Sequence, residues 1–162
     1  MPLRRLLLGI IAVVAAIAGG ILVFPVDKTA AVTRLLDDGE AAIEHADLDR
    51  IDKLISLYYK DDLGFTYASM RGNFSYVFKQ YENITISRTI DAIVIGKDSC
   101  IARVTLWIRG NWLGNTSDIL GTETAYEPVD IYCVRELFRW KVIGTHWPNN
   151  GAGIPSVLER QM

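Results

Sequence analysis

The chain has 162 residues, with 17 basic and 19 acidic side chains and a formal net charge of −2 at pH 7. A near-neutral composition without a basic stripe gives no electrostatic attraction to nucleic acid or to anionic lipid, so we expect neither as a partner. Beyond an apolar N-terminal run, about 136 residues remain. That length is typical of one domain with its own hydrophobic core.

The first feature along the chain is an uncharged, largely apolar run over residues 6–24, preceded by Arg4 and Arg5. A helix of about 20 apolar residues spans a bilayer, and the two arginines favour a cytoplasmic N-terminus. We therefore predict a single-pass inner-membrane anchor over residues 1–25, with the domain outside the cytoplasm, in the periplasm of a bacterium. The alternative is a signal peptide cleaved near Ala18 and a secreted protein. Apolar character that continues to residue 24 favours the anchor.

Three helices are expected next, from apolar residues at helical spacing. Asp27 is the expected cap of a helix that runs to about residue 46. A second helix starts at Asp47, continues through Tyr58 and is closed by the turn over residues 61–64. The range 64–67 is predicted as a short strand. The third helix opens at Ser69 or Asn73 and ends near Tyr81.

The apolar period then changes from 3.6 to 2, which predicts strands. Alternation over 84–94 indicates a long half-buried strand, and 100–112 is the next one. The Gly- and Asn-rich stretch 110–122 is interpreted as a connection, followed by strands near 125–135 and 140–147. Helices grouped before an antiparallel meander predict an α+β fold, in which the sheet curls around the helices as a cone.

Three segments carry a resemblance to a known family: Ala41–Asp49, Leu57–Asp62 and Arg139–Trp147. Their order and spacing resemble the nuclear transport factor 2-like superfamily, which includes SnoaL-like and ketosteroid-isomerase-like proteins. The resemblance implies a cone-shaped domain of three helices on a curved antiparallel sheet over residues 27–148, followed by a short tail, 149–162. One departure is the last hairpin, 136–139, which lacks the Asp-Gly turn of many relatives. One such cone hosts isomerases, dehydratases, cyclases and assembly subunits, so the fold leaves the function open.

The resemblance also points to residues inside the cone. His146, near the end of the last strand, and Asp62, at the end of the second helix, are weak candidates for acid–base catalysis. For both we favour the structural interpretation, a histidine bonded to backbone and an ordinary turn aspartate. The expected pocket-lining residues are Tyr58, Tyr67, Val104, Leu106, Ile131 and His146.

One face of the strand 100–112 combines residue types that are enriched at binding hot spots. Arg103, Trp107 and Arg109 lie on it, opposite the apolar face. We predict an interface there, with a second copy or an envelope protein, at equal weight with a solvated face. No metal is expected, because His45 and His146 lack ligand spacing with acids or thiols, and no cofactor is expected.

The two cysteines fall at corresponding places in two predicted strands. If the connection centres near residue 117, antiparallel residues whose numbers sum to about 233 lie opposite each other, which pairs Cys100 with Cys133. We therefore predict a cross-strand disulfide, which an extracytoplasmic compartment allows. A register slip of one residue would leave two buried thiols on opposite faces.

These observations predict a membrane-anchored, extracytoplasmic binding or assembly protein of the cell envelope, without catalytic activity, that acts as a homodimer or with another envelope protein. The alternative is a SnoaL- or ketosteroid-isomerase-like enzyme, or a carrier, for a small apolar molecule in the cone.

Overall fold

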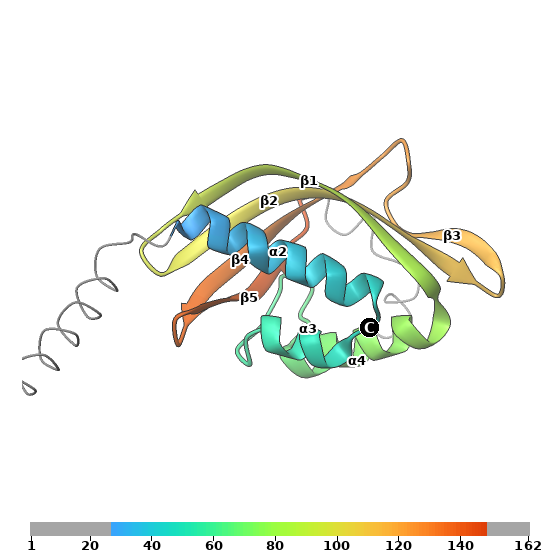
Figure 1. Cartoon of the computed structure of the whole chain (residues 1–162), viewed down its shortest axis with the longest axis horizontal. Helices are drawn as coiled ribbons and strands as arrows, with labels where there is room; N and C mark the ends of the chain where they lie inside the picture. The colour runs from blue at the N-terminus through green and yellow to red at the C-terminus, as the bar shows by residue number, and fades with distance from the viewer. Residues whose placement is uncertain (1–26, 149–162) are drawn as a thin grey trace, which may run out of the picture.

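A computed structural model describes residues 27–148 of the chain. The predicted anchor, residues 1–25, and the tail, 149–162, lie outside the described residues. Within 27–148, none of the helices has both the length and the apolar character needed to cross a bilayer. The described part consists of three helices and one five-stranded antiparallel sheet, which confirms the predicted α+β fold (Figure 1).

The helices begin where short polar side chains cap them. Asp27 caps α2, Lys28–Glu44, by accepting hydrogen bonds from the amides of Thr29 and Ala30 at 3.0 and 3.2 Å. Asp47 caps α3, Leu48–Leu54, through the amide of Arg50 at 2.9 Å. A capping box between Thr66 and Ser69 opens α4, Tyr67–Gln80. These caps satisfy amides that have no partner inside a helix.

The second and third helices differ from the sequence prediction. The structure ends α3 at Leu54 because the next backbone groups pair with the last strand: Ile55 forms a parallel bridge with Val142, and the amide of Lys60 donates to the carbonyl of Ile143 at 3.0 Å. The strand predicted over 64–67 is wrong, because Thr66 forms only an isolated bridge with Lys60 and then caps α4. The third helix therefore begins at Tyr67, before the predicted start at Ser69 or Asn73.

The strands are β1 Glu82–Ile95, β2 Ser99–Trp112, β3 Asn115–Leu120, β4 Glu127–Glu136 and β5 Arg139–His146. Their order is β1-β2-β4-β5, and β3 folds back on the end of β2. Sequence reasoning treated β3 as part of a loop. Its hairpin turns at Leu113 and Gly114, with φ angles of 51° and 79°, and a leucine at the first turn position lacks the usual Asn-Gly signature.

The register of the central strands follows the prediction. Cys100 pairs with Cys133, and Val104 with Val129. Because side chains alternate along a strand, this register puts Val104 and Leu106 on the face toward the helices and Arg103 on the other.

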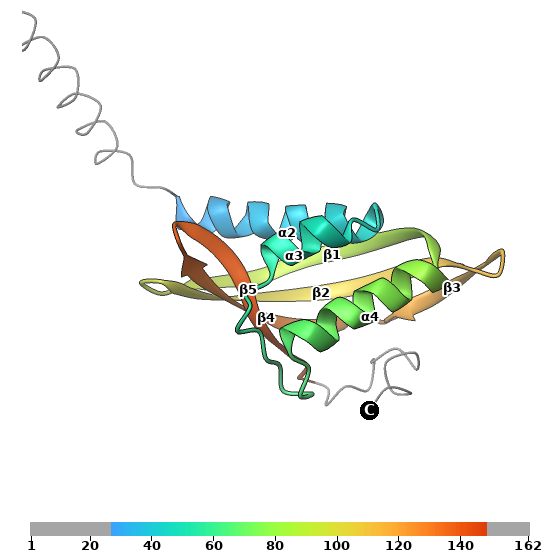
Figure 2. The ribbon, with the colours of Figure 1, turned by 90° about the horizontal axis from the view of Figure 1, so that it is seen from below.

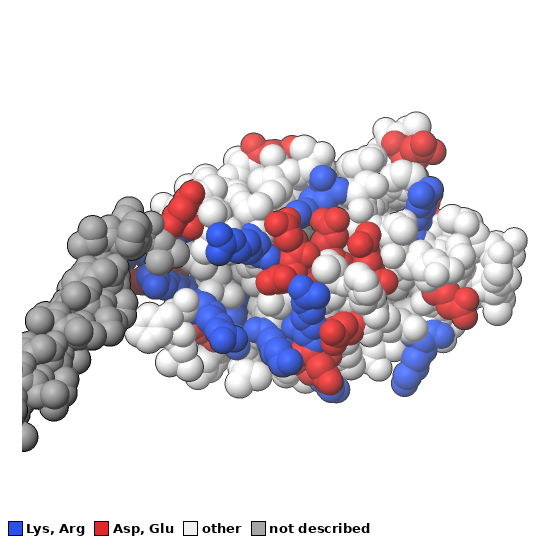
Figure 3. Space-filling view, in the orientation of Figure 1, with Lys and Arg blue, Asp and Glu red and all other residues white. Residues whose placement is uncertain are grey.

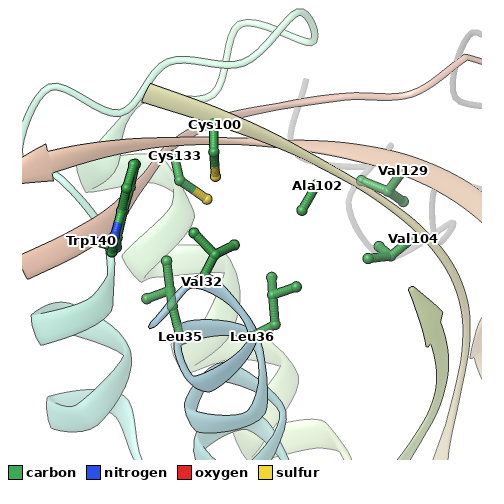
Figure 4. Packing of buried hydrophobic residues seen from close by; sticks show 9 residues of the cluster. All are labelled: Val32, Leu35, Leu36, Cys100, Ala102, Val104, Val129, Cys133 and Trp140. Atoms are coloured by element: carbon green, nitrogen blue, oxygen red, sulfur yellow. The ribbon is translucent and has the colours of Figure 1, made fainter. Parts of the chain in front are cut away.

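The sheet arches over the three helices, which all lie on its concave side (Figures 1 and 2). Two buried clusters hold the layers together. In the first, α2 packs against β2, β4 and β5 (Figure 4) through Val32, Leu35, Leu36, Cys100, Ala102, Val104, Val129, Cys133 and Trp140. In the second, the ends of α2 and α3 pack on the loop before α4, through Ala42, Ile51, Ile55, Tyr59 and Phe65.

Candidate functional site

A cavity of about 280 Å³ lies between the helices and the concave face of the sheet. Members of both buried clusters line it, and every helix and strand contributes side chains. Its walls are predominantly apolar and include Leu36, Ile43, Met70, Phe74, Leu106 and Ile131. A concave apolar space of this size, with few polar groups, is typical of sites for small molecules.

The local sequence explains why the cavity is apolar. On α4, Met70 and Phe74 are four residues apart and therefore share one helix face. On β1, Ile84 and Ile86 are two residues apart and share one sheet face. Both faces turn toward the same interior, and their side chains do not meet across it.

Three polar side chains, joined in a chain of hydrogen bonds, lie at one part of the cavity wall. Tyr59 donates its hydroxyl hydrogen to Asp61 Oδ2 at 3.1 Å, and its oxygen lies 3.0 Å from Thr145 Oγ1, which then acts as the donor. Asp61 Oδ1 accepts the amides of Leu63 at 3.1 Å and Phe65 at 2.7 Å. The carboxylate therefore accepts three hydrogen bonds and holds the loop before α4.

Burial changes the acid–base properties of this chain. It raises the pKa of Asp61, against the lowering effect of the hydrogen bonds from Phe65, Tyr59 and Leu63. It also raises the pKa of Tyr59 above its usual range, so the phenol stays protonated at neutral pH. In both cases loss of hydration penalises the charged form.

Two hydrogen-bond donors on cavity-lining residues have no partner within residues 27–148. One is Nδ2 of Asn73 on α4, a residue that is 5% exposed; the other is Nη1 of Arg88 on β1. The remaining nitrogens of Arg88 are occupied, with Nη2 at 2.6 Å from Asp37 Oδ1 and Nε at 3.1 Å from Glu40 Oε2. A buried donor without a partner costs about 1–3 kcal/mol. Both residues line the cavity, and the two nitrogen atoms themselves are buried.

The structure brings the two catalytic candidates together, but outside the cavity. His146 Nδ1 lies 2.6 Å from Asp62 Oδ2, and the two side chains are 43% and 37% exposed. Neither residue belongs to the cavity lining. The interpretation of His146 as bonded to backbone is thus corrected, because its described partner is the Asp62 carboxylate.

The predicted pocket residues divide into two groups. Leu106 and Ile131 line the cavity. Val104 is fully buried against α2 instead, and Tyr67 packs on the second cluster at the start of α4. Tyr58 is 81% exposed, because the chain has already left α3 when it reaches this position.

The predicted interface residues lie on the outer face of β2 and contact other side chains of the domain. Arg103 Nε forms an ion pair with Asp130 at 2.9 Å. Trp107 Nε1 donates to Asp118 at 2.7 Å, and the Arg109 guanidinium lies 5.0 Å from the Trp107 ring centre. A protein interface on this face stays a prediction.

The cysteine pair lies in the first buried cluster, with both side chains directed to the same interior (Figure 4). Cys100 and Cys133 are directly opposite each other, and both are free thiols in this structure. A hydrogen bond from Cys133 lowers the pKa of Cys100, whereas this bond and burial raise the pKa of Cys133. The register is therefore as predicted, and the disulfide itself stays a prediction.

Three polar cavity residues that the site depends on were not predicted from the sequence as part of it: Asp61, Asn73 and Arg88. Two of them had a readable signal. Arg88 follows Ile84 and Ile86 at the period of two, so a charged side chain occupies an inward position of β1. Asn73 likewise shares a helix face with apolar neighbours three and four residues away. Asp61 differs from Asp62 only by one position in a loop, and no pattern separates them.

No group of three or more potential metal ligands occurs among the described residues. His45 donates from Nδ1 to the carbonyl of Ala41 at 2.7 Å, at the end of α2, whereas His146 contacts Asp62 at the end of β5. The two histidines therefore have separate partners.

Solved structures show where else this fold occurs. A proposed aromatic ring hydroxylase from Novosphingobium aromaticivorans is similar, with 17% identity, a TM-score of 0.63, and coverage of 75% of this chain and 88% of that one. A proposed scytalone dehydratase from the same species has 12% identity, a TM-score of 0.63, and coverage of 73% and 80%. A nuclear transport factor 2-like superfamily protein from Salmonella enterica has 14% identity, a TM-score of 0.59, and coverage of 77% and 89%.

No protein-family model and no curated protein matches the sequence. At these identities the solved structures show the fold alone. The described domain therefore has the fold of nuclear transport factor 2-like proteins, as the three sequence segments predicted.

Proposed function

We propose that this protein binds, without chemical conversion, a small and mainly apolar molecule that carries a hydrogen-bond acceptor. The observation that supports the proposal is the cavity of about 280 Å³ with apolar walls and the two buried donors, Asn73 Nδ2 and Arg88 Nη1. The apolar walls would hold the body of the ligand, and the donors would bind its carbonyl or carboxylate oxygen.

The size of the cavity gives this proposal an energetic basis. The apolar atoms of the walls lack packing partners on the cavity side. A ligand that fills the space gains these contacts and removes apolar surface from water. It also removes the cost of the unpartnered donors.

The polar chain at the wall favours binding over catalysis. A general base needs a lone pair within reach of the substrate proton, and hydrogen bonds to a carboxylate make it a weaker base. Both Asp61 oxygens already accept hydrogen bonds, from Tyr59 and from two backbone amides. In this arrangement the carboxylate supports the loop.

One observation favours the second candidate, an enzyme that uses the cavity. Burial raises the pKa of Asp61, and a carboxyl with a raised pKa in a cavity is a candidate proton carrier. Asp61→Asn separates the two functions, since the amide keeps the shape and can still accept the loop amides. If the protein only binds, ligand affinity stays within about threefold of the original; if Asp61 transfers a proton, turnover is lost while binding remains.

The same proposal includes an anchor at residues 6–24 that holds the domain on the outer side of a membrane. The uncharged run after Arg4 and Arg5 supports it. Extraction of native membranes with alkaline carbonate tests the anchor, which is refuted if the chain is released. Protease digestion of a C-terminal tag in intact spheroplasts tests the side on which the domain lies.

A fluorescent apolar probe tests the cavity directly. The test uses a fragment from Asp27 to Met162, which lacks the apolar run 6–24 and so avoids uptake of the probe by detergent or lipid. N-phenyl-1-naphthylamine should bind once per chain with a rise in fluorescence. Leu106→Phe should weaken binding by about tenfold or more because it occupies the same space. Val104→Phe, two residues away on the same face but outside the cavity, is the matched control.

A matched ligand pair tests the donors. Decanoic acid should displace the probe better than decane. Asn73→Leu should lower the ratio of the two affinities by about threefold to tenfold, which is the effect of one hydrogen bond. Equal displacement by acid and hydrocarbon would refute the assignment of the donors while leaving an apolar cavity.

A further inference from the structure

The hairpin between β4 and β5 has an unusual turn. Leu137 and Phe138 connect the two strands with φ angles of 45° and 70°, the left-handed region that favours Asn and Gly. Both side chains are also almost fully exposed, at 92% and 88%. Two large apolar residues are thus placed where neither the backbone conformation nor water favours them. Both the backbone conformation and the exposure therefore call for a physical explanation.

A second exposed apolar pair lies beside this turn. Leu57 and Tyr58 are 70% and 81% exposed. The residue before them, Ser56, donates from Oγ to Glu136 Oε1 at 2.5 Å, and Glu136 directly precedes the turn. The amide of Ser56 also donates to the carbonyl of Val142 on β5, so the segment that carries the second pair is fixed to the β4–β5 hairpin. Leu57, Tyr58, Leu137 and Phe138 are called the apolar end patch below.

The turn of the apolar end patch, Leu137 and Phe138, lies at the end of the molecule where the described chain begins (Figures 1 and 2). In both ribbon views the start of α2 and the tips of the β1–β2 and β4–β5 hairpins share one end of the long axis (Figures 1 and 2). Lys28 Nζ donates to the carbonyls of Gly96 and Lys97 at 3.2 and 2.7 Å, which fixes α2 to the first hairpin. The amide of Arg135 donates to the carbonyl of Asp98 at 2.9 Å, which fixes the first hairpin to the second.

The length of chain before α2 limits where this end can be. Only residues 25–27 separate the apolar run, which ends at Phe24, from Lys28. Three residues span about 10–11 Å when fully extended. An anchor over residues 6–24 would therefore keep the start of α2 within about that distance of the hydrocarbon core, in the headgroup layer or directly outside it.

Basic side chains lie beside the turn of the apolar end patch. Arg135 and Arg139 flank the turn, and the Arg135 guanidinium lies 5.9 Å from the Phe138 ring centre. Figure 3 shows basic side chains toward the end where α2 starts, whereas acidic ones gather over the middle of α2. An aromatic ring beside a cationic head is typical of side chains at a membrane interface.

We propose that the apolar end patch rests in the surface of the bilayer beside the anchor, with Leu137 and Phe138 among the upper acyl chains and Arg135 and Arg139 at the phosphates. The proposal rests on the predicted anchor and is independent of the cavity. The whole domain gives no electrostatic attraction to anionic lipid, so the contact is held by the anchor and by apolar insertion. The domain is then fixed in one orientation, with the β2–β3 hairpin away from the membrane.

The opposite end of the domain offers a matched control. The β2–β3 hairpin also has a two-residue turn with a strongly exposed leucine, Leu113, which is 82% exposed and has a φ of 51°. It lies at the far end of the long axis (Figure 1). A probe at Leu137 and a probe at Leu113 therefore differ mainly in the direction they face.

The test uses the full chain reconstituted in phosphatidylcholine vesicles. Leu137→Cys and Leu113→Cys are each labelled with the environment-sensitive fluorophore NBD. The wild-type protein, whose two native cysteines are only 3% and 2% exposed, measures the labelling background. At position 137 we expect blue-shifted emission and quenching by a lipid with a nitroxide high on its acyl chain. At position 113 we expect emission as in water and no quenching. Equal behaviour at both positions would overturn the proposal.

A second variant distinguishes loss of the membrane contact from misfolding of the hairpin. Leu137→Asn with Phe138→Gly introduces the preferred turn residues, so the hairpin should keep or gain stability. With this double variant, a label at Tyr58→Cys should lose most of its quenching by the nitroxide lipid. Unchanged quenching would count against the proposal. An alkaline wash of the same vesicles tests the anchor separately: release of the chain refutes the anchor, and retention with an unquenched label at 137 refutes the apolar end patch alone.

Discussion

Replacing Leu106 by phenylalanine tests whether the cavity is a real space. In a well-packed core, a larger side chain costs about 1–3 kcal/mol because the neighbours have to move. Leu106 lines a cavity of about 280 Å³, so the three added carbon atoms can enter empty space. At about 0.8 kcal/mol for each buried carbon, the gain is at most about 2 kcal/mol. For a domain of this size, a gain of 1–2 kcal/mol raises the melting temperature by about 4–8 °C.

Val104→Phe is the matched control for this experiment. Val104 lies on the same face of β2, is fully buried and packs in the first cluster, outside the cavity. We expect it to lose about 1–3 kcal/mol. Urea unfolding and thermal melting of both variants, without added ligand, measure the difference. If Leu106→Phe destabilises the protein as much as Val104→Phe does, the space at Leu106 is already filled, and the reasoning about the cavity is wrong.

Three further predictions concern other parts of the fold. A Cβ at Gly144 would lie 2.6 Å from the carbonyl oxygen of Lys60, so Gly144→Ala should cost about 1–3 kcal/mol in urea unfolding; a neutral result would contradict the close crossing of the two segments. Burial raises the pKa of Asp61, so the folded state holds this proton more tightly than the unfolded state, and stability should fall as pH rises through the folded pKa. Asp61→Asn should remove this part of the pH dependence, and an unchanged urea-unfolding profile would show that the carboxyl is not perturbed. Oxidation should join Cys100 to Cys133 and add ~3–4 kcal/mol by closing a loop of about 34 residues; two alkylatable thiols after oxidation, found by non-reducing mass analysis, would refute the disulfide.

The strands were predictable because their side-chain period is rigid. Between β2 and β4 the alternation holds throughout, so one correct pair determines the rest of the register. In β1 the register shifts between Ile90 and Ala92. Ile93 and Ile95 therefore pack on the core whereas Val94 is 65% exposed, and the alternation in sequence did not show this. The pairing of Cys100 with Cys133 followed from this parity and from the length between the strands. The start of α2 was predictable as well, since Asp27 is a cap of the preferred type.

The errors arose where distant contacts override local pattern. Ile55 and Tyr58 continue the helical spacing of α3, yet the backbone at Ile55 pairs with β5, and α3 ends at Leu54. No local signal reports a partner that is more than 80 residues away. The cavity is similar, because it depends on how far the faces of α4 and β1 stand apart, and apolar faces look the same in sequence whether they meet or leave a space.

Among the site residues, too, some were predictable from the sequence and others were not. Arg88 stands at an inward position of β1, which the alternation could have revealed. Nothing in the sequence distinguishes Asp61 from Asp62. In the structure Asp61 lines the cavity, whereas Asp62 pairs with His146 at the exposed end of β5. One peptide unit in a loop decides which carboxylate is buried.

A crystal structure of the domain with N-phenyl-1-naphthylamine tests the central claim most directly, because it locates the bound molecule. The account predicts one probe between the helices and the concave face of the sheet, in contact with Leu106 and Ile131. A probe bound only at the apolar end patch, with side chains closed over the cavity, would contradict it.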